Sequence, residues 1–362
     1  MNANINTRGY LRNHYFYIHN WRILMASYGL PYTGSKNRLA EKIIRHLPEA
    51  DTLVDGFFGG GAITHCAMTH NKYKNYIAND IRTTPQFFKE CLEGKYSNDL
   101  RWISADDFTK ASRDDWFVRL IWSFSNNCNC YLYGKNTEAY KKAFHYAICF
   151  DDFSLLEELY CDFVCNKVRE HLEGIPVESW NDRRLAAMRA VKELITLRPN
   201  ELTRKDFNCS TDTGGNLQQH LERMYRIDNL IRNTRIMNLE RLNRISDLNV
   251  STHNLHCYNL DYHLLTDIIP DNSVVYLDPP YKGTFDYSEN TSGGCMSSTG
   301  CFNTKEFLDW AYDIGKKHTT FISEYNIDDS RFTLVCEWAR FCSANGVGKR
   351  GHVSEKLYTV KR

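Results

Sequence analysis

Residues 278–281 of this 362-residue chain, Asp-Pro-Pro-Tyr, carry its most specific chemical pattern. Residues 274–277 before them are apolar and predict a buried strand, which two consecutive prolines cannot continue. The chain must therefore leave the sheet at the carboxyl end of that strand, where open α/β sheets bind ligands. There the Asp278 carboxylate and the Pro279 carbonyl can accept hydrogen bonds from an exocyclic amine, while Tyr281 stacks on a planar base.

A glycine-rich turn with the sequence LVDGFFGGGA occupies residues 53–62. The predicted strand ends at Asp55, and the glycines let a ligand approach backbone N–H groups closely. Asp80 ends the next predicted strand, where a carboxylate can accept hydrogen bonds from the two hydroxyls of a ribose. The turn alone could equally be a tight turn without a ligand, but the turn and Asp80 together favour an adenosine-containing cofactor. The glycine spacing differs from the dinucleotide fingerprint, and the absence of a phosphate-loop sequence excludes the ordinary phosphate-loop nucleotidases.

Strands that alternate with helices place these two motifs in one sheet. A strand, a glycine turn and a helix follow one another over residues 51–70, and a second strand follows over 75–80. The strand that ends at Asp278 precedes a predicted helix over 304–318 and a strand over 319–325. This order is typical of βαβ units, so we expect an α/β fold with a parallel sheet drawn from two separated halves of the sequence.

Residues 115–248, between these halves, lack strand alternation and predict a mainly helical insertion. The chain is also longer than one hydrophobic core usually supports, which favours two substructures. Lys and Arg outnumber Asp and Glu over residues 181–245. If residues 217–245 form one helix, four arginines share one edge of it: Arg223, Arg226, Arg241 and Arg244. This edge either contacts nucleic acid or is simply solvated.

Overall charge predicts no partner, because 45 Lys and Arg residues balance 44 Asp and Glu residues. Residues 1–40 nevertheless contain no acid and residues 339–362 are basic, which is typical of a solvated face or of contact with a polyanion. The 13 cysteines form no C-x-x-C pair, so we expect reduced thiols and no metal site. The start of the chain lacks the apolar core of a signal peptide, and no apolar run can span a bilayer, so we expect a cytoplasmic protein.

Five segments resemble, in content and in order, the motifs of Dam-type DNA adenine-N6 methyltransferases, which belong to the alpha group of amino methyltransferases. They are PYTGSKNRLAEKI at 31–43 around Lys36, the glycine turn through Phe57, Gly59 and Gly61, IANDI at 77–81 through Asp80, HCYNLDYHLL at 256–265 through Asp261, and SVVYLDPPYKGT at 273–284. FISEYN at 321–326 and the segment 342–360 are also similar to the family's last strands and loop.

The resemblance implies a Rossmann-like, S-adenosylmethionine-dependent methyltransferase sheet with an inserted, mainly helical target-recognition domain. The expected domains are a basic and aromatic extension at 1–30, a catalytic domain formed by 31–114 and 249–362, and a DNA-binding insertion at 115–248. The implied reaction is site-specific transfer of a methyl group from S-adenosylmethionine to N6 of an adenine flipped out of double-stranded DNA, without a metal.

Roles for individual residues follow from the resemblance, position by position. The catalytic residues would be Asp278, Pro279, Pro280 and Tyr281. The cofactor would be bound by Lys36, Asp55, Phe57, Gly59, Gly61, Asp80 and Asp261, with Lys36 serving either the cofactor or the target pocket. The candidate DNA-binding residues are Asn127 and Lys135 in the segment 123–136, Arg223 and Arg226 on the basic edge of the predicted helix rather than from the resemblance, and Lys349 and Arg350 in the basic last segment. A structural cap at Asp261 and simple core packing at Phe57 stay open as alternatives.

Two departures from the family pattern matter. Gly56 stands where the family usually has proline before the phenylalanine, which softens the turn. SFSNNCNCYLYGKN at 123–136 resembles the segment that leads into target recognition but lacks its Gly-Leu-x-Arg portion, so recognition of GATC does not carry over. Residues 288–301, rich in Gly, Ser and Thr, predict a mobile loop over the active site.

Several alternatives stay open at the level of function. The same acceptors suit the amine of cytosine, so N4-cytosine methylation competes with adenine methylation, and a catalytically idle DNA-binding protein of the same fold is the alternative outside enzymes. The pattern is typical of prokaryotic or phage enzymes. It reveals neither the recognition sequence, nor the oligomeric state, nor a restriction endonuclease partner.

Overall fold

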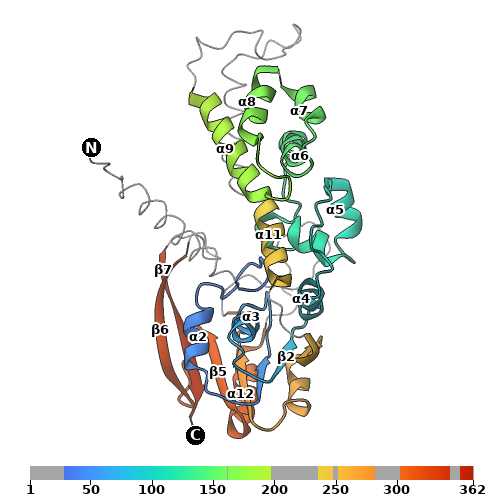
Figure 1. Ribbon diagram of the computed structural model, residues 1–362. Coiled ribbons are helices and arrows are strands. Elements are labelled where there is room, and N and C mark those ends of the chain that lie inside the picture. Colours follow the sequence, from blue (N-terminus) through green and yellow to red (C-terminus); the bar gives the residue numbers. More distant parts are fainter. Residues whose placement is uncertain are drawn as a thin grey trace, which may run out of the picture. The chain divides into compact units, whose positions relative to one another are not determined.

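The computed structural model describes residues 28–160, 162–196, 235–247, 252–281, 302–342 and 351–361 (Figure 1). These residues form two compact units. The first contains residues 28–30, 34–93 and the described residues from 252 onward, and the second contains 31–33 and the described residues between 94 and 247. The expected extension before residue 28, the expected loop at 288–301, and four expected DNA-binding residues lie outside the described residues: Arg223, Arg226, Lys349 and Arg350.

A seven-stranded sheet forms the centre of the first unit, in the order β3-β2-β1-β4-β5-β7-β6. The strands are β1 Thr52–Asp55, β2 Asn75–Asn79, β3 Leu255–Tyr258, β4 Ser273–Leu277, β5 Thr319–Glu324, β6 Phe332–Cys342 and β7 Gly351–Val360. The strands β3, β2, β1, β4 and β5 are parallel, whereas β7 runs antiparallel to both β5 and β6 (Figure 1). The α/β fold with a parallel sheet drawn from two sequence halves is thereby confirmed.

Helices pack against this sheet and complete its core. They are α2 Ala40–His46, α3 Ala62–Thr69, α4 Thr84–Leu92 and α12 Thr304–Lys317, with short 3-10 helices at Thr252–Asn254 (η4) and Tyr262–Asp267 (η5). The central strands β1 and β4 are buried along their whole length, as expected for parallel strands covered on both faces. Their side chains Val54, Val275 and Leu277 pack with Phe307 and Ile314 of α12 in one cluster. This packing fixes the carboxyl ends of the strands where the chemical motifs begin.

The glycine turn between β1 and α3 uses backbone conformations that favour glycine. Gly59 has φ +51° and Gly61 has φ +70°, both in the left-handed region. A Cβ atom at Gly61 would lie 2.1 Å from a ring carbon of Phe58, which is itself buried. The turn therefore depends on glycine at position 61 for its backbone conformation and for its packing.

We expect Gly61→Ala to destabilise the first unit in two ways. The left-handed backbone costs roughly 1–2 kcal/mol for a residue with a Cβ, and the displaced Phe58 ring costs about 1–3 kcal/mol of overpacking. Gly174→Ala is a matched control, because Gly174 has φ +74° but nothing lies within 4 Å of its Cβ position. Thermal unfolding should show a larger loss for Gly61→Ala. Equal losses would mean that the Phe58 contact contributes nothing.

The second unit is built from helices around its own core. They are α5 Ala105–Ala111, a π-helix at Phe117–Ile121 (η1), a 3-10 helix at Phe124–Asn126 (η2), α6 Lys135–Phe150, α7 Ser154–Leu159, α8 Asp162–Leu172, α9 Trp180–Thr196 and α11 Arg235–Ser246. Leu156, Val164, Val168, Ala187 and Val191 join α7, α8 and α9 in one buried cluster. In the described residues, the helical character predicted for this stretch is present, and no helix is long and apolar enough to cross a membrane.

Some basic residues of this unit serve its fold. The buried guanidinium of Arg183 donates hydrogen bonds to the carbonyl oxygens of Ala147, Ile148 and Ile175, and it pairs with Asp151. These contacts join the end of α6 to the start of α9. The local excess of Lys and Arg therefore overstates how much positive charge this unit offers to a partner.

The division between the units falls after Glu93, earlier than the expected boundary at residue 115. Residues before 115 belong with the helical unit because α5 packs against η1 and because Arg101 pairs with Asp115 across 3.0 Å. On the other side the division follows Asp247, next to the expected boundary at 248.

Candidate active site

Three carboxylates follow three adjacent parallel strands of the first unit. Asp55 ends β1, Asp80 comes directly after β2, and Asp278 comes directly after β4. β1 pairs with both β2 and β4, so the carboxyl ends of the three strands meet at one edge of the sheet. The structure thus brings the glycine turn and the Asp-Pro-Pro-Tyr segment together, as their positions in the sequence predicted.

Lys36 contacts the carboxylate of Asp278 directly. The Lys36 Nζ atom donates to Asp278 Oδ1 at 2.7 Å and to Asp278 Oδ2 at 2.8 Å. The two side chains are 7% and 18% exposed, so this ion pair is shielded from water much more than a surface pair. Lys36 was expected to serve the cofactor or the target pocket, and the structure places it against the acid of the Asp-Pro-Pro-Tyr segment.

A second buried carboxylate, Glu355 of β7, faces the same lysine. Its side chain is 1% exposed, and its Oε1 atom lies 3.5 Å from Lys36 Nζ. The hydroxyl of Tyr281 donates to the same Oε1 atom. Lys36 Nζ also lies 4.5 Å from the centroid of the Tyr281 ring, within the range of a cation–π contact. One ammonium group is therefore shared by two carboxylates and an aromatic face.

Burial sets the electrostatics of this group. It raises the pKa of Asp278 above the ordinary value, the Lys36 ammonium opposes that rise, and the nearby Glu355 carboxylate adds to it. Burial also raises the pKa of Tyr281 well above the ordinary value, so its hydroxyl stays protonated and keeps donating to Glu355. A region with two carboxylates and one ammonium carries an excess of negative charge, which suits an incoming N–H donor.

Asp80 lies beside the glycine turn and accepts a hydrogen bond from its backbone. Its Oδ2 atom accepts a hydrogen bond from the backbone N–H of Gly59 at 2.8 Å, and its Oδ1 atom accepts one from the N–H of Arg82 at 2.9 Å. Burial raises the pKa of Asp80, and these backbone donors oppose the rise. The Phe57 ring next to the turn packs with Tyr262, Phe302 and Phe307, with centroids 5.5–6.0 Å apart.

Asp55 has an unusual environment for a carboxylate. It is 2% exposed, and the hydroxyl of Thr64 donates to its Oδ2 atom at 2.7 Å. Its Oδ1 atom is buried and has no hydrogen-bond partner among the described residues. Burial raises the pKa of Asp55 to about 7, with the negative charges of Asp278 and Asp80 adding to the rise. A buried acceptor without a donor at a ligand-binding edge fits a donating, cationic group of a bound molecule.

The other expected residues occupy less informative positions. Asp261 is exposed and caps η5, accepting hydrogen bonds from the N–H of His263 at 3.0 Å and from its Nδ1 atom at 2.7 Å. In the second unit, Asn127 Oδ1 accepts from the N–H of Asn129 at 3.0 Å, and Lys135 is exposed at the start of α6. The cofactor role of Asp261 and the DNA-binding roles of Asn127 and Lys135 stay predictions.

Glu355 is a site residue that the sequence motifs do not predict. The segment that contains it was noted only as similar to the family's last strands. A usable signal was present, because Glu355 precedes Leu357 by two residues and so shares its face of a strand. A carboxylate on the buried face of a strand requires a partner, and the structure supplies Lys36 and Tyr281.

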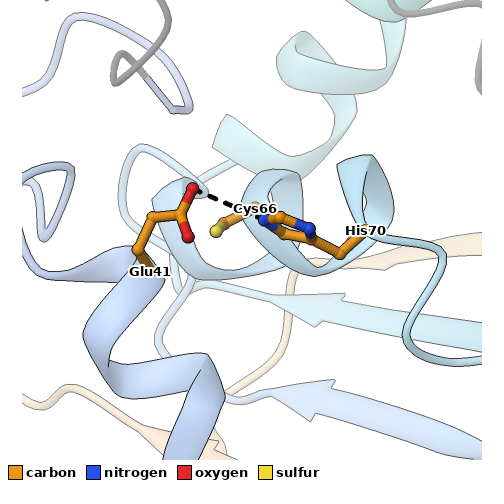
Figure 2. Close-up of side chains that lie close together, drawn as sticks. All are labelled: Glu41, Cys66 and His70. Carbon is orange, nitrogen blue, oxygen red and sulfur yellow. Dashed lines mark ion pairs between the residues drawn. The ribbon is translucent and has the colours of Figure 1, made fainter. Parts of the chain in front are cut away.

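A separate group of potential metal ligands lies between α2 and α3. Figure 2 shows Glu41 of α2 beside Cys66 and His70, whose ligand atoms lie within 4.8 Å of one another. His70 Nε2 is 3.4 Å from Glu41 Oε1, and the Tyr28 hydroxyl donates to the same oxygen. Burial raises the pKa of Cys66 to about 12, which holds its thiol protonated. Hydrogen bonding and burial account for this arrangement, so we assign no metal to it.

Comparison with known proteins gives one informative result. The family model described as D12 class N6 adenine-specific DNA methyltransferase matches residues 32–294, more than half of the chain. The matched range contains the glycine turn, the three acids at the sheet edge and the Asp-Pro-Pro-Tyr segment. A search of curated proteins gives no significant match.

Proposed function

We propose roles for the residues of the site from one premise: the chain belongs to the D12 class N6 adenine-specific DNA methyltransferase family. It is therefore an enzyme that methylates N6 of adenine in DNA. This membership favours adenine methylation over the two other hypotheses, N4-cytosine methylation and a catalytically idle DNA-binding protein. The finer assignments concern the residues that receive the base, the residues that hold the cofactor and the form of the DNA.

The target amine is received by Asp278 and the carbonyl of Pro279. The lone pair of an adenine amine is conjugated with the ring, so the amine is a poor nucleophile. Hydrogen bonds from its two N–H groups to these acceptors localise the lone pair outside the ring plane. The Asp278 carboxylate, which lies directly after β4 and is largely buried, supports this role because burial strengthens its interaction with a donor.

Tyr281 provides the aromatic face for the base, and Pro280 keeps the chain out of the sheet. Stacking on an aromatic side chain contributes roughly 1–3 kcal/mol per base, which offsets part of the cost of unstacking it from a duplex. That cost exists only if the adenine is flipped out of double-stranded DNA, which we take as the substrate form. Most of the rate then arises from positioning and electrostatics.

The cofactor is S-adenosylmethionine, which this family generally uses and which supplies an electrophilic methyl group carried on a sulfonium. The residues at the sheet edge fit such a molecule. The unpartnered Oδ1 atom of Asp55 suits its ammonium group, and the carboxylate of Asp80 suits its ribose hydroxyls. Gly59, Gly61 and the Phe57 ring border the same turn, where backbone can approach a ligand closely.

Cofactor binding can be tested by thermal unfolding of the purified protein with S-adenosylmethionine or S-adenosylhomocysteine. Saturating ligand should raise the unfolding midpoint, because a ligand at 100 times its Kd adds about 2.7 kcal/mol of stability. Asp80→Asn and Asp55→Asn should each weaken the ligand's affinity about tenfold or more, since each removes a charged hydrogen-bond acceptor. Asp271→Asn, at an exposed position before β4, is the control and should bind normally.

If the ligand raised the unfolding midpoint of Asp55→Asn and Asp80→Asn as much as that of the Asp271→Asn control, the two acids would not contact the ligand. No shift for the unmodified protein would argue against S-adenosylmethionine as the cofactor. Target recognition is assigned to the second unit, whose described part includes Asn127 and the exposed Lys135.

A further inference from the structure

We propose that Glu355 is a positioning residue: it receives the Lys36 ammonium when Asp278 takes up the amine of the target base. The inference rests on the proposed role of Asp278 as acceptor of that amine. It adds a residue of β7, far from the Asp-Pro-Pro-Tyr segment in sequence, to the set that governs the reaction.

Lys36 occupies the Asp278 carboxylate in this structure. Both of its carboxylate oxygens accept hydrogen bonds from Lys36 Nζ, at 2.7 and 2.8 Å. An ammonium held evenly between both oxygens neutralises the charge that makes a carboxylate a strong acceptor. Asp278 in this state is a weaker acceptor for the amine than a carboxylate whose cation has moved away.

Glu355 offers the Lys36 ammonium a second carboxylate partner. Its Oε1 atom already lies 3.5 Å from Lys36 Nζ, so a short movement of a flexible side chain converts this approach into a full ion pair. The ammonium would remain buried and paired throughout, which avoids the large penalty of leaving it without a counter-charge. As Lys36 moves, Asp278 regains its full acceptor strength at the moment the amine needs it.

Two substitutions distinguish this role of Glu355 from a simpler one. Glu355 also accepts the Tyr281 hydroxyl, so it could act only by fixing the orientation of the aromatic ring. Glu355→Gln retains an oxygen acceptor for that hydroxyl and the shape of the side chain, but it removes the charge that attracts Lys36. Tyr281→Phe does the reverse, because it removes the hydroxyl and leaves the Glu355 charge in place.

The experiment compares these two variants in steady-state methylation of duplex DNA that lacks N6-methyladenine. We expect Glu355→Gln to lower kcat about tenfold or more while the KM for DNA and the affinity for S-adenosylhomocysteine change little. Tyr281→Phe should lose only about two- to threefold in kcat. Glu355→Asp, which restores a carboxylate, should recover more activity than Glu355→Gln.

Three results would overturn the inference. One is a Glu355→Gln enzyme with the kcat of the unmodified protein, another is a larger loss in Tyr281→Phe than in Glu355→Gln, and the third is a Glu355→Asp enzyme no better than Glu355→Gln. The thermal shift with S-adenosylhomocysteine shows whether each variant is folded, and if Glu355→Gln is not, Glu355→Asp and Tyr281→Phe decide between the roles. An unmodified protein without methyl transfer would instead contradict the proposed function itself.

Discussion

Asp278→Ala should lower kcat for methyl transfer by about a thousandfold or more, the loss expected when a positioned acceptor of a reacting proton is removed. The variant keeps the Pro279 carbonyl and the Tyr281 ring but loses the only one of these groups that carries negative charge. The amine would then keep its lone pair in the ring system as the methyl group approaches. Steady-state kinetics on DNA lacking N6-methyladenine measures this loss.

Two controls test whether the loss in Asp278→Ala is specific to the acceptor of the amine. S-Adenosylhomocysteine should still raise its unfolding midpoint, because Asp278 is assigned to the base and Asp55 and Asp80 to the cofactor. Asp271→Ala, an exposed acid a few residues earlier in the chain, should keep nearly full kcat. Substantial residual turnover by Asp278→Ala would show that the carboxylate is not the acceptor of the amine.

Lys36→Met should damage both activity and stability, because Lys36 is the cation that Asp278 and Glu355 share. Removing one partner of a buried ion pair costs roughly 3–5 kcal/mol. The Lys36 charge lowers the pKa of Asp278 and so opposes the rise caused by burial and by Glu355. Without it the pKa of Asp278 rises further, so less of the ionised acceptor is present, and kcat near neutral pH should fall by about a hundredfold.

The pH dependence of Lys36→Met has a definite sign. The pKa of Asp278 in the folded variant rises further above its value in the unfolded chain, so the folded protein binds more protons between these two values. Stability of the variant should therefore fall as the pH rises through that window. Its kcat should rise over the same window, because only ionised Asp278 is a strong acceptor.

Measurements of kcat and of the unfolding midpoint across pH test this pair of opposite trends. Lys42→Met, at an exposed position of α2, is the matched control and should change neither. A Lys36→Met enzyme whose activity and stability vary with pH as in the unmodified protein would show that Lys36 does not govern the charge of Asp278.

The central part of the site could be predicted because it depends on local patterns at strand ends. Asp55 and Asp278 each end a short apolar run, Asp80 follows a further short strand, and parallel strands bring such ends to one edge of a sheet. The glycine-rich sequence likewise predicts a turn between β1 and α3, and Gly59 and Gly61 have positive φ angles in that turn.

Glu355 could not be placed in the same way, because its position depends on strand order. β7 lies between β5 and β6 and runs antiparallel to both, an arrangement that neighbouring residues in the sequence do not specify. The same limit applies to Lys36, whose partner Asp278 lies 242 residues away in the chain. Long-range pairing of buried charges is set by packing, and only the nature of the needed partner can be anticipated.

The first boundary of the helical unit was also not predictable from the sequence. Residues 94–114 contain no strong composition shift, yet they pack with the helices that follow, through α5 against η1 and through the Arg101–Asp115 ion pair. Arg183 is part of the excess of Lys and Arg over residues 181–245, but its guanidinium is buried and donates to backbone carbonyls.

The most direct test of the central claim is nucleoside mass spectrometry after incubating the protein with methyl-labelled S-adenosylmethionine and unmethylated double-stranded DNA, with single-stranded DNA and RNA alongside. We expect labelled N6-methyladenine from the double-stranded DNA, and none when Asp278→Ala replaces the unmodified protein. Label in N4-methylcytosine, label only in RNA, or no label in any nucleic acid would contradict the account.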